Sequence, residues 1–428
     1  MKHRTSLVDI PQRLTVKRIA TEGVLAYDID NAYPQRVMDI IKGSATAFRC
    51  NEIYTKFIVG QGFADKTFYK AKVNKLGQTN DFILRKVSND LAMFRGFAFH
   101  VNYNANYQIT DVYSVPFEHC RLAVEKDSYI PYAVAVYDDW NRRRFKQIKK
   151  DNIDYIDFFN PENVEEEVIK AGGFDKYKGQ ILYFSVDGHE YPTATSDPVL
   201  EDCVTDGEIK VKKYNDIRTN FMASHIYINR AVTEDGDSTD DLNSVLTSFQ
   251  GADNSSKIMR VDSPEESQDP KLIKVDYQDT DKLFEYTESS VQDNIRMNYG
   301  MASILIGKEV SGKLGTAGEE IEAVESYNKK TADERLIVEE VYKKVFAFYY
   351  MPINPTDDYS IIPLTATSEN VDSQNLATVI GVGGVQAITT ILVDPVLTPE
   401  QKTNMIRVIF GVDENSAKAM VYGTTITE

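Results

Sequence analysis

The sequence predicts an α+β protein with more than one domain. Between Phe97 and about Phe159, segments such as FAFHVNYN and YAVAVYDD alternate apolar and polar residues, as half-buried strands do. Longer segments on either side repeat apolar residues at spacings of three and four, as helices do. The chain has 428 residues, which is enough for two to four domains of ordinary size. Its hydrophobic content of 42% and charged content of 26% are typical of a soluble globular protein.

Net charge and cysteine content exclude several classes of protein. The formal charge is −17, whereas a protein that wraps nucleic acid needs net positive charge, so we expect only local or transient contact with DNA. The three cysteines lie far apart and form no C-x-x-C pair, which argues against a zinc site or a disulfide framework and favours a reducing compartment. The most apolar window, Ala377–Val393, contains three glycines and favours a buried element over a membrane span. The N-terminus has no apolar core of a secretory signal.

The first part of the chain predicts helices followed by a sheet. Apolar residues at helical spacing run from Val37 to Ile58, and Gly60–Gly62 stops them. A second helix is predicted over Asn80–Phe94, ended by Gly96. An antiparallel sheet extends to about Phe159, and an acidic helix over Glu162–Lys170 and a strand, GQILYFSV, complete this part.

The middle of the chain predicts two long helices around a small acidic unit. Ser196-Asp197-Pro198 starts a helix to Met222, with Asp197 as cap and proline in the first turn, where its missing N–H costs nothing. The unit over Ile226–Gln278 contains strand-like HIYINRAV, SKIMRV and KLIKVDY and a short helix around Leu242–Phe249. The second long helix covers Asp281–Tyr299. From Ala231 to Ser290 there are 15 Asp and Glu against 5 Lys and Arg, so most of the net charge lies here.

A glycine-rich loop follows the second long helix. Gly307-Lys308-Glu309-Val310-Ser311-Gly312-Lys313 reads G-x-x-x-x-G-K, which is a nucleotide-binding P-loop without its last residue. That residue should be Ser or Thr to bind magnesium, and here it is Leu314. No βαβ pattern precedes the loop, so we interpret it as a mobile loop with two ammonium groups, Lys308 and Lys313. A T-x-x-E capping box at Thr316 then opens a third long helix to Phe348.

Other candidate sites favour ordinary structural interpretations. DGDSTDD (235–241) lacks the glycine and glutamate of a calcium loop, which favours a solvated acidic turn. NRRRFKQIKK (141–150) could hold phosphate, but it lies where two strands would turn, which favours a hairpin tip. The five histidines show no metal-ligand spacing, and His119 and Cys120, adjacent on a strand, point to opposite faces. We therefore expect no catalytic residue, no metal and no cofactor.

The order of these elements resembles the portal protein of tailed bacteriophages. The resemblance is carried by YPTATSDPVLEDCVTDGEIKVKKYNDIRTNFMASHIYI and by SVQDNIRMNYGMASILIGKEVSGKLGTAGEEIEAVESYNKKTADERLIVEEVYKKV, between about Tyr191 and Tyr350. The proline usual in the turn of that family is absent, since Ala302 and Ser303 stand there. The resemblance implies a wing (1–196), two stem helices (197–225 and 279–300), a clip (226–278), a tunnel loop with a long wing helix (301–359) and a helical crown (360–428).

The resemblance also implies a function and partners. Members of the family form twelve-subunit rings at one capsid vertex of the virion, assembled in the host cytoplasm, through which double-stranded DNA is packaged and ejected. Expected partners are further copies of the chain, terminase, the major capsid protein and a head–tail adaptor, with no membrane. Lys308, Ser311 and Lys313 would face DNA from the tunnel loop. The partner interface of the clip would include Glu234, Asp235, Asp237, Asp240, Asp241, Glu265 and Glu266.

Two alternatives from other classes stay open. One is a nucleotide-binding enzyme with a degenerate P-loop that uses Lys313, and a nucleotide titration distinguishes it because the portal interpretation predicts no binding. The other is a monomeric α+β adaptor protein, which a mass measurement in solution separates from a ring.

Overall fold

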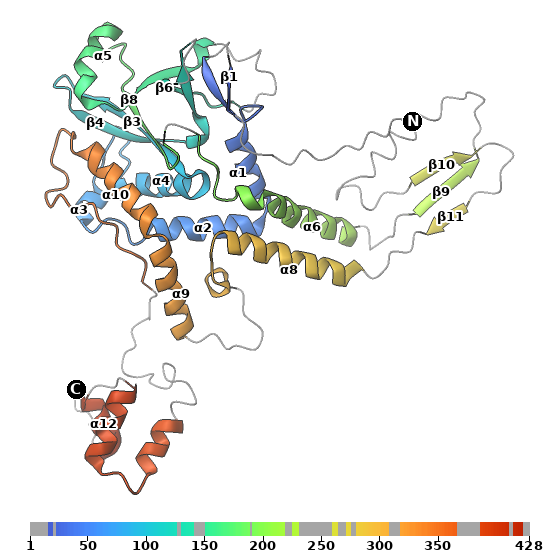
Figure 1. Cartoon of the computed structure of the whole chain (residues 1–428), viewed down its shortest axis with the longest axis vertical. Helices are drawn as coiled ribbons and strands as arrows, with labels where there is room; N and C mark the ends of the chain where they lie inside the picture. Colours follow the sequence, from blue (N-terminus) through green and yellow to red (C-terminus); the bar gives the residue numbers. More distant parts are fainter. Residues whose placement is uncertain are drawn as a thin grey trace. The chain divides into compact units, whose positions relative to one another are not determined.

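A computed structural model describes residues 16–19, 23–125, 130–140, 150–188, 191–218, 225–230, 259–263, 271–274, 280–307, 317–365, 386–410 and 414–422. The chain divides into two compact units, one of residues 1–308 and 327–364 and the other of residues 309–326 and 365–428. Helices and sheets both contribute to the first unit, so the predicted α+β class is confirmed (Figure 1).

An eight-stranded sheet forms the body of the first unit. Its strand order is β1-β2-β5-β6-β7-β8-β3-β4, and every neighbouring pair is antiparallel except β7 and β8. The strands are β1 (Val16–Ile19), β2 (Val24–Tyr27), β3 (Gly96–Tyr103), β4 (Ile109–Val115), β5 (Cys120–Val124), β6 (Pro131–Val136), β7 (Asp154–Phe158) and β8 (Gln180–Ser185). The predicted antiparallel pairing is confirmed between β3 and β4 and from β5 to β7, but β8 pairs parallel with β7, so the sheet as a whole is mixed.

Helices pack against this sheet and against one another. The helix α4 packs on β3 and β4, and α2 packs on α4, so these elements form layers (Figure 1). The Tyr342 ring of α10 lies 5.3 Å from the Phe99 ring of β3, which brings α10 against the sheet as well. These helices are α1 (Tyr33–Gly43), α2 (Ala45–Val59), α3 (Lys66–Lys70), α4 (Asn80–Phe94), α5 (Val164–Ala171) and α10 (Ala332–Phe346).

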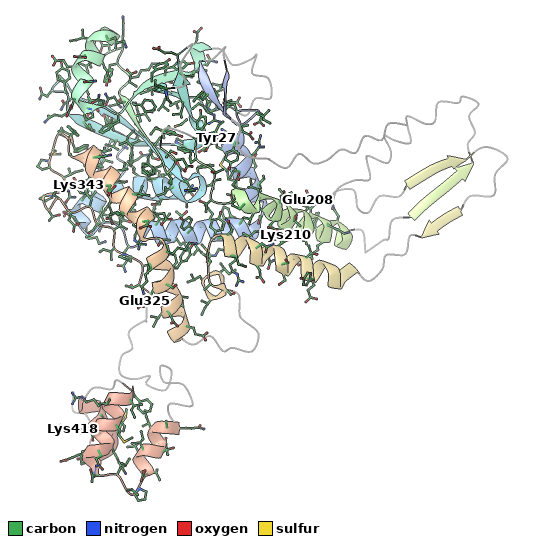
Figure 2. All side chains as sticks on the ribbon, in the orientation of Figure 1. Tyr27, Glu208, Lys210, Glu325, Lys343 and Lys418 are labelled. Atoms are coloured by element: carbon green, nitrogen blue, oxygen red, sulfur yellow. The ribbon has the colours of Figure 1, made fainter. Side chains whose placement is uncertain are left out.

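Two helices, α6 (Leu200–Arg218) and α8 (Thr280–Asn298), lie side by side as a pair (Figure 1). Glu208 and Lys210 belong to α6 (Figure 2). Between the two helices in sequence, a separate sheet contains β9 (His225–Arg230), β10 (Met259–Ser263) and β11 (Lys271–Lys274), in the order β10-β9-β11. The three strands predicted for this segment are confirmed. The short helix predicted around Leu242–Phe249 lies outside the described residues.

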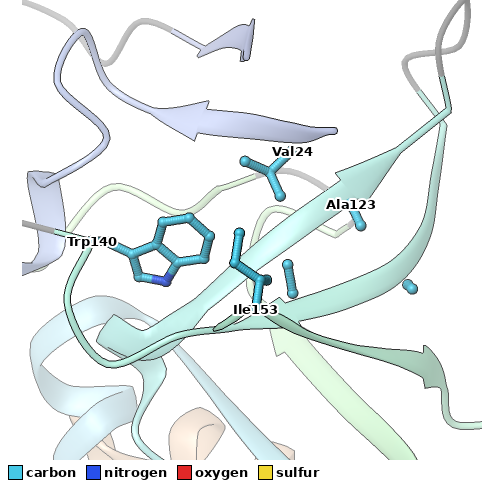
Figure 3. Packing of buried hydrophobic residues seen from close by; sticks show 6 residues of the cluster. Val24, Ala123, Trp140 and Ile153 are labelled. Atoms are coloured by element: carbon cyan, nitrogen blue, oxygen red, sulfur yellow. The ribbon is translucent and has the colours of Figure 1, made fainter. Parts of the chain in front are cut away.

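Each face of the large sheet has its own apolar core, because side chains on a strand alternate between the two faces. On β6, Ala133 and Ala135 pack with Trp140 and Ile153, and Val24 and Ala123 complete this cluster (Figure 3). Val134, between the two alanines, packs on the other face with Ala98, Cys120, Ile156 and Ile181. Both faces of this part of the sheet are therefore buried.

The C-terminal part of the second unit is a small helical bundle. It contains a helix over 386–393, α12 (Pro399–Phe410) and α13 (Glu414–Tyr422). Ile388, Ile406 and Ala417 form its buried core. The helix break predicted at Asp394-Pro395 is confirmed.

The predicted third long helix is wrong as a single element. The structure divides it into α9 (Ala317–Lys330) and α10 at Thr331, which has φ −92° and ψ 11°. The Arg335 side chain donates to the Asn328 carbonyl at 2.6 Å, to the Phe57 carbonyl at 2.9 Å and to Thr331 Oγ1 at 2.7 Å. These bonds satisfy carbonyls at the ends of α9 and α2, so ending the helix leaves few polar groups unpaired.

Helix ends differ from the sequence prediction at three other places. The apolar repeat from Val37 to Ile58 forms two helices, because Ser44 is extended and its Oγ caps α2 by accepting from Ala47 N–H at 3.0 Å. Arg95, not Gly96, takes the left-handed conformation after α4, with φ 59°. Asp197 does not cap; it lies in a 3₁₀ turn (Asp197–Val199) before α6, and Ser196 is the N-cap residue.

Candidate functional site

The α6–α8 pair is the candidate site for assembly with other chains. Asp202, early in α6, accepts from Asn294, late in α8, at 3.4 Å, and Lys213 forms an ion pair with Glu288. These contacts show that the two helices run antiparallel. Each helix also has buried apolar residues, Cys203 and Ile209 on α6 and Val291 and Ile295 on α8.

A buried carboxylate joins α6 to the body. Asp206 is 1% exposed and accepts from Ser44 Oγ at 2.6 Å, from Lys210 Nζ at 3.0 Å and from Thr46 N–H at 3.3 Å. Burial by itself would raise the pKa of Asp206, but the bonds from Ser44, Lys210 and Thr46 outweigh it and the pKa is lowered. One carboxylate therefore links the start of α2 to the middle of α6.

A tyrosine side chain binds the segment that precedes α6. Tyr33, on α1, donates its hydroxyl proton to Asp197 Oδ1 at 2.5 Å and accepts from Ala194 N–H at 3.1 Å. This use of the Asp197 carboxylate explains why it does not cap the helix. The backbone before α6 is thereby held to α1 at two points.

The end of α8 is held in the same way. The Tyr299 carbonyl accepts from the Tyr327 hydroxyl at 3.0 Å and from the Lys330 ammonium. Lys330 occupies the space where Gly300, at φ 60°, has no side chain, since a Cβ there would lie 2.1 Å from Lys330 Nζ. A cation against the last carbonyls of a helix also favours the helix dipole. The helix pair is thus fixed to the body at the start of α6 and at the end of α8.

Apolar side chains remain on the outer sides of the pair. Tyr286 is 76% exposed and Met297 is 71% exposed, and their spacing of eleven residues places them on one stripe of α8. On α6, Val204 and Tyr214 are also exposed. Exposed apolar side chains of this size can pack against another protein surface.

The residues that the resemblance assigned to DNA and to partners are not tested by the structure. Gly307 is the last described residue of the loop motif, in the left-handed region at φ 76°, and it ends a 3₁₀ turn (Ser303–Ile306). Lys308, Ser311 and Lys313 lie outside the described residues. The same holds for the clip residues Glu234, Asp235, Asp237, Asp240, Asp241, Glu265 and Glu266.

The cysteines lie in the described part of the chain and are buried. Burial raises the pKa of the Cys50 thiol to about 11 and that of the Cys203 thiol to about 12, so both stay protonated near neutral pH. Within the described part of the chain, no group of three or more His, Cys, Asp or Glu side chains is placed to hold a metal ion. Of the helices that the structure describes, none combines the length and apolar character needed to cross a bilayer.

Sequence reasoning missed the polar residues that build this site. Asp206 and Lys210 stand four apart, which is an ion-pair spacing on a helix and was a readable signal. Thr331-Ala332-Asp333-Glu334 repeats the T-x-x-E pattern and could have indicated the break before α10. Nothing in the sequence indicates that Lys330 would meet Tyr299, because that contact depends on the path of the chain between them.

Comparisons with known proteins find similarity only among solved structures. No protein-family model and no curated protein matches the chain. A chain from the neck of an empty gene transfer agent particle is 12% identical, with a TM-score of 0.43, covering 89% of this chain and 94% of that one. A chain from the neck of the native particle is 11% identical, with a TM-score of 0.40 and coverage of 89% and 94%. An HK97-family phage portal protein from Corynebacterium diphtheriae is 9% identical, with a TM-score of 0.32 and coverage of 67% and 83%.

Proposed function

We propose that the chain is a phage portal protein, the subunit of a closed ring that conducts double-stranded DNA at one vertex of a capsid. The observation that carries the proposal is the α6–α8 pair, which is anchored to the body by buried polar contacts and carries apolar side chains on its outer sides. Exposed apolar side chains on two different helices can meet when α8 of one copy packs on α6 of the next. Each copy then keeps a free α6 on one side and a free α8 on the other, and such a head-to-tail contact makes a ring when its rotation closes.

The other parts of the chain take roles around this ring. The stem helices would be 197–225 and 279–300, with the clip over 226–278, the wing over 1–196 and the crown over 360–428. The clip would bind terminase and later a head–tail adaptor, and the wing would contact the major capsid protein. We take twelve as the number of subunits, as in the family that the sequence resembles.

The loop around Lys308–Gly315 would supply weak contacts to passing DNA. Two lysines per subunit, repeated around a ring, make a belt of positive charge inside an acidic wall. Such contacts are screened by salt and read no base sequence, which suits a duplex that has to slide. Lys308 and Lys313 would then bind phosphate of the DNA backbone rather than a nucleotide.

The test is the mass of the assembly with a matched pair of variants. Mass photometry of the full chain should show a ring, and Tyr286→Lys with Met297→Lys should leave monomers. The control is Tyr350→Lys with Met351→Lys, which changes an equally apolar, exposed Tyr–Met pair of the body. The control should still form rings, and circular dichroism should show that both variants are folded. A wild-type chain that is only monomeric or dimeric at micromolar concentration would contradict the proposal.

The two alternatives predict other results. A nucleotide-binding enzyme predicts saturable binding of ATP or GTP that Lys313→Ala abolishes, whereas the portal proposal predicts none. A monomeric adaptor predicts that the stem variant and the control have the same mass as the wild type.

A further inference from the structure

We propose that the surface made by α3, the turn after it and the first turns of α4 binds the phosphate backbone of double-stranded nucleic acid. We call it the basic surface and define it by six exposed cations: Lys66, Lys70, Lys72, Lys75, Arg85 and Lys86. It belongs to the body and is separate from the loop and the helix pair of the proposed function, on which it does not depend.

The charge of this segment is opposite to that of the chain. Residues 66–86 contain six Lys and Arg against one acidic residue, Asp81, which is a net charge of +5 in a chain of −17. Because distant charges are screened within about 10 Å at 0.1 M salt, a local patch acts on a partner almost independently of the rest of the molecule. The overall acidity therefore does not prevent a phosphate backbone from binding here.

The fold holds the elements that carry the six cations next to one another. Asn80, which begins α4, donates from its side chain to the Phe68 carbonyl at 3.0 Å and from its backbone to the Ala71 carbonyl at 3.1 Å. Lys72 pairs with Thr79 in an isolated β-bridge, which closes the turn between α3 and α4. Figure 1 shows α3 beside α4. The segments that carry these cations, α3, the turn and α4, are therefore held together by contacts with the backbone.

Four of the six cations have no carboxylate partner among the described residues. Arg85 pairs with Asp81 at 2.9 Å and Lys75 approaches Asp111 at 3.6 Å, while Lys66 donates to the Gln61 and Phe63 carbonyls. Lys70, Lys72 and Lys86 form no ion pair with any described residue. Lys86 lies over the exposed Phe82 ring, 5.8 Å from its centre. Exposed lysines without a carboxylate partner keep the charge that a phosphate needs.

The kind of cation favours nucleic acid over an acidic protein. Five of the six cations are lysines, a residue type that is depleted in protein–protein interfaces. Lysine meets phosphate as a point charge without a required geometry, and such contacts hold a duplex without reading its sequence. The surface is also spread over three elements, which fits a polyanion with repeated charges better than a single phosphate group.

The experiment measures binding of the full chain to a covalently closed circular duplex across a salt series. A closed circle cannot thread through a closed ring, so it reports outer surfaces and excludes the channel. The variant is Lys70→Gln, Lys72→Gln and Lys86→Gln. The control removes the same charge elsewhere, at exposed lysines of α1, α5 and the loop after α5: Lys42→Gln, Lys170→Gln and Lys176→Gln.

We expect the wild type to bind, with an affinity that falls steeply with salt. The slope of log K against log [salt] should become shallower by about 0.9 for each phosphate that the protein no longer neutralises, so by about 2 to 3 in the variant and by little in the control. A third protein, with Lys308→Gln and Lys313→Gln, should bind the circle like the wild type.

Three outcomes would overturn the proposal. One is no binding by the wild type at 50 mM salt. Another is an equal loss of affinity in the variant and the charge-matched control, which would assign binding to net charge alone. The last is tighter binding of polyglutamate than of duplex at equal charge concentration, which would indicate an acidic protein as the partner. None of these outcomes bears on the ring, because ring formation is read from mass.

Discussion

The sheet body and the α6–α8 pair differ in how their side chains are buried and hydrogen-bonded. In the body, even a fully buried guanidinium, that of Arg121, has its hydrogen bonds made inside the fold. In the pair, Val291 and Ile295 of α8 are buried while Tyr286 and Met297 of the same helix stay exposed. The body also exposes single apolar side chains such as Leu76 and Ile169, whereas Tyr286 and Met297 share one side of a helix, which is the side that the proposed ring would use.

The comparison predicts that the largest loss of stability comes from the body, at Arg121. Its guanidinium donates to Asn31, to Gln35 and to the Glu118 and Cys120 carbonyls, and lies between the rings of Tyr27 and Trp140 at 5.4 and 5.2 Å. Arg121→Ala leaves a cavity and several buried acceptors without donors, which should lower the free energy of unfolding by about 3–5 kcal/mol. Urea denaturation measures it. Arg49→Ala, at an exposed ion pair, is the control and should change stability by less than about 0.5 kcal/mol.

A second prediction concerns Asp90, also in the body. Burial, and then the charge of Glu118, raise the pKa of Asp90 to about 8, while Phe117 N–H donates to its Oδ2 at 3.2 Å. An unfolded Asp titrates near about 3.9, so the folded state holds a proton that the unfolded state has lost. Stability should therefore fall as pH rises from about 4 to 8.

Asp90→Asn should remove this dependence, because the amide imitates the protonated acid. We expect the variant to equal the wild type near pH 4 and to exceed its free energy of unfolding by about 1–3 kcal/mol at pH 9. Denaturant midpoints at several pH values measure it. Parallel pH curves for the two proteins would show that Asp90 does not carry the effect.

A smaller effect is expected where α6 joins the body, at Asp206. Its pKa is lowered, so its stabilisation is present above about pH 3.9, the unfolded value, and is lost as pH falls through the folded value. Asp206→Asn should cost about 1–2 kcal/mol at pH 7 and less near pH 3, since the bonds to Ser44 and Lys210 weaken without the negative charge. A cost that does not change with pH would mean that packing, not charge, holds this joint.

The smallest effect is expected within the pair itself. Lys213 and Glu288 form an ion pair whose lysine side chain is 49% exposed, and exposed pairs contribute about 0–1 kcal/mol. Lys213→Ala should therefore lower the stability of the chain by at most about 0.5 kcal/mol in thermal or urea unfolding. A loss of stability as large as that at Arg121 would show that contacts within the pair stabilise the chain as much as contacts within the body, and would contradict the difference between the two regions.

Local sequence patterns determined much of this protein. The helix over Asn80–Phe94 and the three strands of the small sheet follow from periodicity, which is a property of neighbouring residues. The excess of acidic residues between Ala231 and Ser290 is likewise a property of the sequence alone. The missing hydroxyl at Leu314 already argues against nucleotide binding without any coordinates.

Only the tertiary structure decided the contacts between distant residues. Asp206 is buried because Ser44, 162 positions away, lies against it, and Thr331 ends a helix because Arg335 can reach carbonyls of both α2 and α9. The segments that carry the cations at positions 66 to 86 are held together because Asn80 joins the start of α4 to α3. Such effects depend on burial and on partners that the chain path brings together, and a pattern of adjacent residues contains neither.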